Sequence, residues 1–147
     1  MDTRWKPNVT VATLVEREHK YLLVHEHIDN QSVYNQPAGH LNKGESLIAA
    51  AKRETLEETA YEVEITHYLG MYRYIAANGT TYLRHGFTGS VRKHCADYPL
   101  DKGIIEAVWM SYADIVGHLD QMRSPLVKQL VDDYLKGEFY PLALLHE

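Results

Sequence analysis

One stretch decides the fold: Gly39-His-Leu-Asn-Lys-Gly-Glu45-Ser-Leu-Ile-Ala-Ala-Ala-Lys-Arg53-Glu54-Thr-Leu-Glu57-Glu58-Thr-Ala60-Tyr61. Ser46 is a favourable N-cap, because its hydroxyl can accept a hydrogen bond from a backbone N–H of the first helical turn. The residues that follow predict a helix from Leu47 to about Thr59. Ahead of it, we interpret Asp29 to Gly44 as one long loop, whose length favours a functional role.

Three carboxylates of this helix fall on one face. At about 100° per residue, Glu54, Glu57 and Glu58 lie within an arc of roughly 100°. Like charges four residues apart are destabilising, and Arg53 is placed four residues before Glu57 to form an ion pair. A solvated acidic face is one interpretation. The other is a site for a hard divalent cation, Mg²⁺ or Mn²⁺, which takes oxygen ligands.

A divalent cation would suit the hydrolysis of small phosphorylated compounds. The ion neutralises phosphate charge and polarises water, while a carboxylate takes the proton. The chain has 15 Lys plus Arg against 20 Asp plus Glu, a net charge of −5. This balance argues against a protein that coats nucleic acid polymers or anionic membranes, since both need basic patches. A metal ion bound between the protein and a phosphorylated substrate would allow this acidic protein to bind a negatively charged compound.

Length and composition predict one soluble domain over residues 1–147. Cys95 is the single cysteine, so it can form no internal disulfide and fill no cysteine-rich zinc site. The stretch from Met1 to Asn8 lacks the apolar core of a signal peptide, and no apolar run approaches the ~20 residues that span a bilayer. We therefore expect a cytoplasmic protein, and leave its oligomeric state open.

Strands are expected on both sides of the helix, from their β-branched and aromatic residues. Asn78-Gly79 predicts a tight hairpin turn between the two longest of them. The expected strands are Val9 to Val15, Tyr21 to Val24, Val63 to Ile75, Thr81 to Val91 and Glu106 to Met110. Strands precede and follow the helix, and further helices come last. This order predicts layers of helices and sheet, a fold of the α/β class in its α+β form.

Two further helices are marked by their ends. Ser111 with Asp114 resembles a capping box that opens a short helix. Ser124 as N-cap, Pro125 at the first helical position and Gly137 as a stop delimit the last helix.

The spacing now matches a known pattern. Gly39, five residues, Glu45, seven residues and then Arg53-Glu54-x-x-Glu57-Glu58 resemble the signature box of the Nudix hydrolases, here residues 39–61. The resemblance implies a mixed β-sheet sandwiched between α-helices. Ala60 stands where the family has glycine, and Thr55 where an aliphatic residue is usual. Neither departure removes a carboxylate, although alanine reaches left-handed backbone geometry less easily than glycine.

The resemblance also implies roles for the residues of the box. Glu57 and Glu58 would be metal ligands, together with the carbonyl oxygen of Gly39. Glu54 would be a further ligand or the base that activates water. Arg53 would orient the glutamates, with Glu45 as its partner. Several relatives recruit an acid outside the box, for which Asp101 and Glu106 are the candidates, although an exposed loop acid is the favoured interpretation of each alone.

A wider resemblance implies a substrate class. Tyr34-Asn-Gln-Pro-Ala-Gly-His-Leu41 and Arg123-Ser-Pro-Leu-Val127 are similar to segments of a bacterial phosphatase subgroup of this family. That subgroup releases orthophosphate from nucleoside di- and triphosphates and from hydroxymethylpyrimidine pyrophosphate. Two alternatives stay open: a Nudix-like module that senses a nucleotide or docks a partner without turnover, and a pyrophosphohydrolase that removes oxidised nucleoside triphosphates.

Substrate contacts are predicted outside the acidic cluster. His40 adjoins Gly39, Tyr34 and Tyr74 could stack on a heterocycle, and Arg84 could face phosphates. The glycine spacing of Gly39 and Gly44 resembles a P-loop, but Glu45 occupies the lysine position and would repel phosphates.

Overall fold

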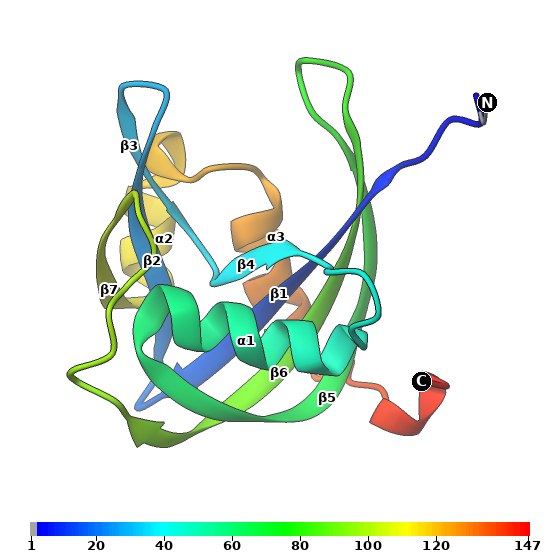
Figure 1. Ribbon diagram of the computed structural model, residues 1–147. Coiled ribbons are helices and arrows are strands. Elements are labelled where there is room, and N and C mark those ends of the chain that lie inside the picture. Colours follow the sequence, from blue (N-terminus) through cyan, green and yellow to red (C-terminus); the bar gives the residue numbers. More distant parts are fainter. Residues whose placement is uncertain (1–2) are drawn as a thin grey trace.

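A seven-stranded mixed sheet forms the centre of the molecule, seen in a computed structural model that describes residues 3–147 (Figure 1). The strands follow the order β3-β2-β1-β6-β5, with β4 added to β1 and β7 to β2; β1 and β6 are parallel and the other pairs antiparallel. Their bounds are β1 Asn8–Arg17, β2 Lys20–Ile28, β3 Gln31–Asn35, β4 Ala38–His40, β5 Tyr61–Ile75, β6 Thr81–His94 and β7 Ile104–Ser111.

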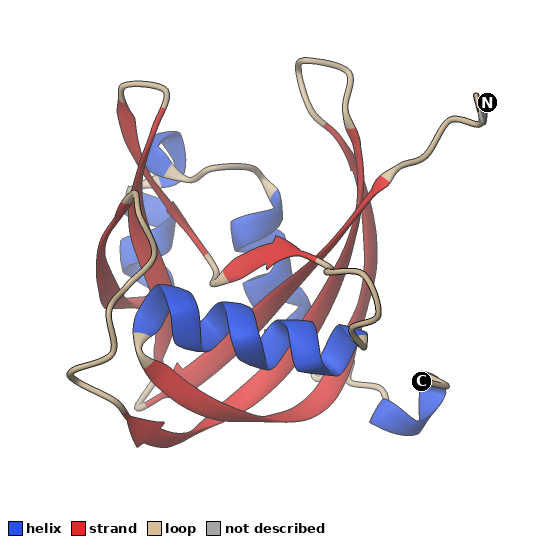
Figure 2. Ribbon diagram, viewed as in Figure 1, coloured by secondary structure: helices blue, strands red, loops and turns tan. Residues whose placement is uncertain are grey.

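Helices cover both faces of the sheet, as Figure 2 shows. The bounds are α1 Leu47–Thr59, α2 Tyr112–Gly117 and α3 Leu126–Leu135, with 3₁₀ turns at Leu119–Gln121 and Leu142–Leu144. The expected mixed sheet between helices is therefore confirmed. Within residues 3–147, no helix is long and apolar enough to cross a membrane. Met1 and Asp2 of the N-terminal stretch lie outside the described residues.

Strand β1 separates two apolar cores, because its successive side chains point to opposite faces. Val11 and Val15 pack with Ala50 and Ala51 of α1 on one face. On the other face, Ala12 and Leu14 pack with α3, including Val127 and Leu130. Helix α1 is thereby fixed against the sheet, and its acidic residues lie near β4.

The prediction of one long loop from Asp29 to Gly44 is wrong, because this segment contains β3 and β4. Asp29 and Asn30 both adopt positive φ and connect β2 to β3 in a two-residue hairpin, a geometry that Asp and Asn tolerate. Strand β4 has only three residues and pairs with β1, so it depends on tertiary contacts rather than on local sequence preference.

Helix α1 has the predicted bounds. The Ser46 hydroxyl accepts a hydrogen bond from the Ala49 N–H, and Ala60 closes the helix in the left-handed region with φ of 62°. A single L-residue in that region costs roughly 1–2 kcal/mol, so Ala60 is strained where glycine would not be. Thr55, fully buried, satisfies its hydroxyl by donating to the Ala51 carbonyl oxygen at 2.7 Å.

The other predicted elements are present with small shifts. Five residues, 76–80, join β5 to β6, so the turn at Asn78-Gly79 is longer than a tight two-residue turn. The capping box of Ser111 and Asp114 is confirmed by both hydrogen bonds. Helix α3 begins one residue later than predicted, and Gly137 follows it at positive φ.

Candidate active site

Arg53 is the centre of a charged network on α1. Its guanidinium donates to both oxygens of Glu45, from Nε at 2.7 Å and from Nη2 at 3.0 Å. Nη1 donates to Glu54 at 2.7 Å and to Glu57 at 3.2 Å, and Nη2 also donates to the His40 carbonyl oxygen. These five bonds match the five N–H donors of arginine. The predicted Arg53–Glu57 and Arg53–Glu45 ion pairs are therefore both present.

The pKa values of Glu45 and Glu54 move in opposite directions within this network. Hydrogen bonds from Arg53 hold the pKa of Glu45 below its usual range. Glu54 is half-buried, and burial raises its pKa although Arg53 acts in the opposite direction. Glu45 is therefore held in its ionised form beside Arg53, and Glu54 is a stronger base than Glu45.

An acid from outside the helix joins Glu54 and Glu57. Carboxylate oxygens of Glu54, Glu57 and Asp101 all lie within 4.8 Å of one another, the only such group of three potential metal ligands among residues 3–147. The Asp101 backbone N–H donates to the Glu57 carbonyl oxygen at 3.0 Å, which ties the loop before β7 to α1. Of the two outside acids considered from sequence, the structure thus brings Asp101 to the cluster.

Glu106 lies elsewhere. It is exposed on β7 and pairs in register with His25 of β2. His25 itself stacks on Tyr34, with ring centroids 4.4 Å apart.

Glu58 is not one of the three clustered carboxylates, although the charges of Glu54 and Asp101 act on it. Glu58 is 9% exposed, and its carboxylate accepts a hydrogen bond from the Ala38 N–H of β4 at 2.8 Å. Burial raises the pKa of Glu58 to about 8, and the nearby charges of Glu26 and Glu54 act in the same direction. A nearby cation would oppose this shift, because it favours the ionised form.

Gly39 lies against the Glu54 side chain. A Cβ atom at Gly39 would overlap the carboxyl carbon and both oxygens of Glu54. Because the φ of Gly39 lies outside the left-handed region, space for the carboxylate rather than backbone freedom requires glycine here.

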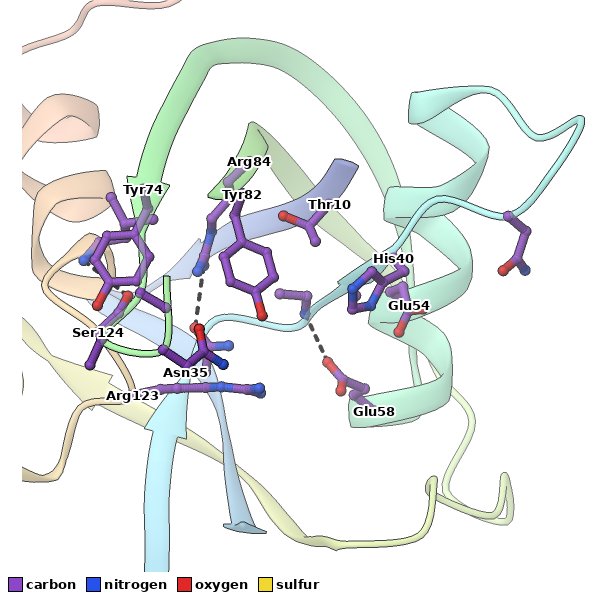
Figure 3. A pocket seen from close by; sticks show the side chains of 17 residues that line it. Thr10, Asn35, His40, Glu54, Glu58, Tyr74, Tyr82, Arg84, Arg123 and Ser124 are labelled. Carbon is purple, nitrogen blue, oxygen red and sulfur yellow. Dashed lines mark hydrogen bonds between the residues drawn. The ribbon is translucent and has the colours of Figure 1, made fainter. Parts of the chain in front are cut away.

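A cavity of about 710 Å³ opens beside these acids (Figure 3). Glu54 and Glu58 border it from α1, and His40 borders it from β4. Tyr74 and Arg84 of the β5–β6 hairpin lie farther from α1 than His40 does, while the Tyr82 ring lies beside His40, with ring centroids 6.4 Å apart. The loop residues 76–78 also line the cavity. This volume is in the range that holds a small ligand.

Three of the four predicted substrate contacts, His40, Tyr74 and Arg84, line this cavity, and Tyr34 does not. Side chains alternate along a strand, so Asn35 lines the cavity while the Tyr34 ring stacks on His25 on the opposite side. Strand β3, which was not predicted, sets this alternation.

Sequence reasoning missed other lining residues, including Asn35 and Arg123. Arg123 donates from its backbone N–H to the Tyr34 carbonyl oxygen and from Nη1 to Glu26, both at 2.8 Å. Its position in the Arg123–Val127 segment that resembles family members was the available signal.

Comparisons with known proteins bear on this arrangement. Residues 5–133 match the family described as NUDIX domain. The chain belongs to the NUDIX family. It is 38% identical over 141 residues to the phosphatase NudJ of Escherichia coli strain K12, covering 96% of this chain and 92% of that protein.

Solved structures agree with this membership. A NUDIX hydrolase from Nitrosomonas europaea superposes with a TM-score of 0.95 at 46% identity, covering 97% of each chain. A MutT protein from Methanosarcina mazei shares the fold, with a TM-score of 0.73 at 22% identity over 92% of this chain and 99% of that one. This NUDIX protein is a phosphohydrolase that acts on phosphate anhydrides.

Proposed function

We propose that this NUDIX protein is a Mg²⁺-dependent cytoplasmic hydrolase of nucleoside di- and triphosphates and hydroxymethylpyrimidine pyrophosphate-like compounds that releases orthophosphate. Mn²⁺ would serve in place of Mg²⁺. One observation carries the proposal: Glu54 belongs both to the group of three carboxylates and to the wall of the cavity. An anhydride bound in the cavity would therefore lie next to the acids.

The residues fit a hard divalent ion. Glu54, Glu57 and Asp101 offer oxygen ligands only, which is the donor set that Mg²⁺ prefers. Glu58 and the carbonyl oxygen of Gly39 are the further ligands proposed. The overlap that a Gly39 side chain would cause with Glu54 also supports a site in which the Glu54 carboxylate lies directly against the β4 backbone. When bound, the ion would neutralise phosphate charge and lower the pKa of water.

Residues of the chain position the carboxylates, and one carboxylate accepts a proton from water. Arg53 holds Glu54 and Glu57 through Nη1, while its bidentate pair with Glu45 fixes the guanidinium plane. The reaction forms a bond from a water oxygen to phosphorus and breaks the anhydride P–O bond. A carboxylate takes the proton from water. Glu54 is proposed as that base or as a ligand, and its raised pKa suits proton transfer.

The substrate class rests on likeness to a phosphatase. The 38% identity to phosphatase NudJ supports release of orthophosphate. In the cavity, His40 is positioned to contact the phosphates beside Gly39, while Tyr74 and Tyr82 offer aromatic faces for a heterocycle.

The test is a panel of nucleoside triphosphates, nucleoside diphosphates and hydroxymethylpyrimidine pyrophosphate, incubated with the protein and Mg²⁺. Orthophosphate and pyrophosphate are measured separately. The proposal predicts orthophosphate from these compounds and loss of turnover with a chelator. Pyrophosphate alone would indicate a pyrophosphohydrolase of oxidised nucleotides, and nucleotide binding without either product would indicate a sensor module.

A further inference from the structure

Among residues 3–147, Arg84 is a buried cation that forms no ion pair, although the charges of Glu58 and Glu26 act on it. The residue is 7% exposed, and burial lowers its pKa to about 10. Nη2 donates to Asn35 Oδ1 at 3.3 Å and to Gln36 Oε1 at 2.9 Å, both neutral amide oxygens. Nε is buried and has no hydrogen-bond partner among residues 3–147. A buried charge that lacks an ionic partner is costly, so its retention requires a reason.

The other two arginines near the cavity differ from Arg84. Arg53 contacts three carboxylates, and Arg123 contacts Glu26 at 2.8 Å. Both therefore have their charge matched inside the protein. Arg84, by contrast, makes no hydrogen bond from Nη1 to any of the described residues, and it lines the cavity, where a ligand could supply an acceptor.

The surroundings of Arg84 offer donors to a ligand. Arginine has five N–H donors and no acceptor. Asn35 lines the cavity, and because its Oδ1 atom accepts from Arg84, its NH₂ group remains as a donor. Gln36 is held in the same way, since its Nε2 donates to the Val127 carbonyl oxygen at 2.8 Å. This part of the cavity is therefore suited to ligand oxygen or ring nitrogen acceptors.

Aromatic rings lie on the same face of the sheet. Tyr82 precedes Arg84 by two residues on β6 and therefore points to the same side. Tyr74 is the cross-strand partner of Tyr82 on β5, and both rings line the cavity (Figure 3). The part of a ligand beside Arg84 would thus be a flat heterocycle, while the phosphates would lie toward the acids of α1.

Resting on the proposed function, we infer that Arg84 is a specificity-determining residue that selects heterocycles with an oxo group facing it, so that guanine and hypoxanthine nucleotides bind in preference to adenine nucleotides. The adenine amino group would place a donor against the donors of Arg84. Arginine pairs with the O6 and N7 acceptors of guanine for the same reason. The same donors could also bind a phosphate oxygen, and the test separates the two sources.

The test compares kcat/KM for GTP, ITP and ATP in wild type, Arg84→Lys and Arg84→Met. We expect wild type to prefer GTP and ITP over ATP by about tenfold. Arg84→Met should lose this ratio, and Arg84→Lys should keep part of it. Arg92→Met is the matched control, because Arg92 lies on the same strand but is exposed and outside this cavity. Its ratio should equal that of wild type.

Inhibition by tripolyphosphate separates phosphate binding from base recognition. If Arg84 recognises the heterocycle, Arg84→Met should leave this inhibition within about twofold of wild type. A loss of tripolyphosphate inhibition that equals the loss of GTP turnover, or a wild type without preference for the oxo purines, would overturn the inference.

A binding measurement keeps the inference separate from the proposed function. GMP and AMP are compared by thermal shift of the wild-type protein in a chelator, where no turnover is needed. A larger shift with GMP supports the inference even if no anhydride is hydrolysed. Equal shifts, or no shift with either nucleotide, would overturn it even if hydrolysis is observed. Because this comparison uses wild type, it stands if Arg84→Met fails to fold.

Discussion

Gly39 and Glu54 occupy adjoining space, such that any side chain at Gly39 would overlap the Glu54 carboxylate. Gly39 lies on β4, a three-residue strand paired with β1, whereas Glu54 lies in the middle of α1. The close approach of strand and helix therefore defines where the Glu54 carboxylate can lie. It also places the backbone of β4 beside the acids.

Gly39→Ala should separate activity from stability. The added methyl group would displace the flexible end of Glu54, while the backbone of Gly39 can accept alanine. We expect kcat/KM to fall at least about tenfold, with the free energy of unfolding changed by less than about 1 kcal/mol. Steady-state kinetics and chemical denaturation measure the two quantities. Gly117→Ala is the control, since a Cβ atom there meets nothing within 4 Å. Full activity in Gly39→Ala would refute the claim that activity depends on the close approach of Gly39 to the Glu54 carboxylate.

Glu57→Gln should reduce turnover by at least about a hundredfold and weaken the dependence on Mg²⁺. The amide keeps the size of the side chain and one oxygen. It removes one of the three clustered negative charges, those of Glu54, Glu57 and Asp101. Turnover measured across a Mg²⁺ titration gives both the loss of turnover and the change in Mg²⁺ dependence. Glu64→Gln, an exposed residue of β5, should behave as wild type. Wild-type kinetics in Glu57→Gln would end the assignment of Glu57.

Asp101→Asn should raise the Mg²⁺ concentration needed for half-maximal turnover by about tenfold or more, because one of three clustered carboxylates is lost. Glu106→Gln is the matched control, since Glu106 is the neighbouring acid of the same segment but lies exposed on β7. If both variants showed the same Mg²⁺ dependence, Asp101 would have no role in metal binding.

The metal-free protein should lose stability as the pH rises, through Glu58. Its carboxyl has a pKa of about 8 in the folded chain against 4.5 in the unfolded chain. The folded state thus binds the proton more tightly. The stabilisation by protonated Glu58 is complete below about pH 4.5 and is lost as the pH rises through about 8.

Glu58→Gln should remove this pH dependence, because the amide is neutral and can still accept from the Ala38 N–H. In a chelator, the free energy of unfolding of wild type relative to Glu58→Gln should fall by at least about 1 kcal/mol between pH 5 and pH 9. Denaturation at both pH values measures it, with Glu64→Gln as control. Parallel pH profiles for wild type and Glu58→Gln would contradict the expected titration.

Local sequence signals were sufficient to predict the helices whose first residues are capped by side chains. Helix α1 has a serine cap, and α2 has a reciprocal capping box, so their starts were predictable. Strands β3 and β4 were missed because they have five and three residues and are stabilised by pairing with β2 and β1. Asp29-Asn30 was the overlooked signal, since both residues can adopt positive φ in a hairpin turn.

The candidate site was predictable where one helix carries it. The spacing of Glu54, Glu57 and Arg53 placed them together, because i and i+3 or i+4 residues share a helix face. Asp101 comes from a loop more than 40 residues away, so only the fold brings it to Glu57. Glu58 shares the helix face, and its carboxylate accepts from the Ala38 N–H of β4, a contact that was not predictable because β4 was not predicted.

The most direct test of the central claim is an anomalous difference map from crystals soaked in Mn²⁺. We predict a peak about 2.0–2.4 Å from a carboxylate oxygen of Glu57, with oxygens of Glu54, Glu58, Asp101 or the Gly39 backbone in the same shell or bound through water. A map with no peak at these acids, and with their carboxylates turned into bulk solvent, would contradict the account.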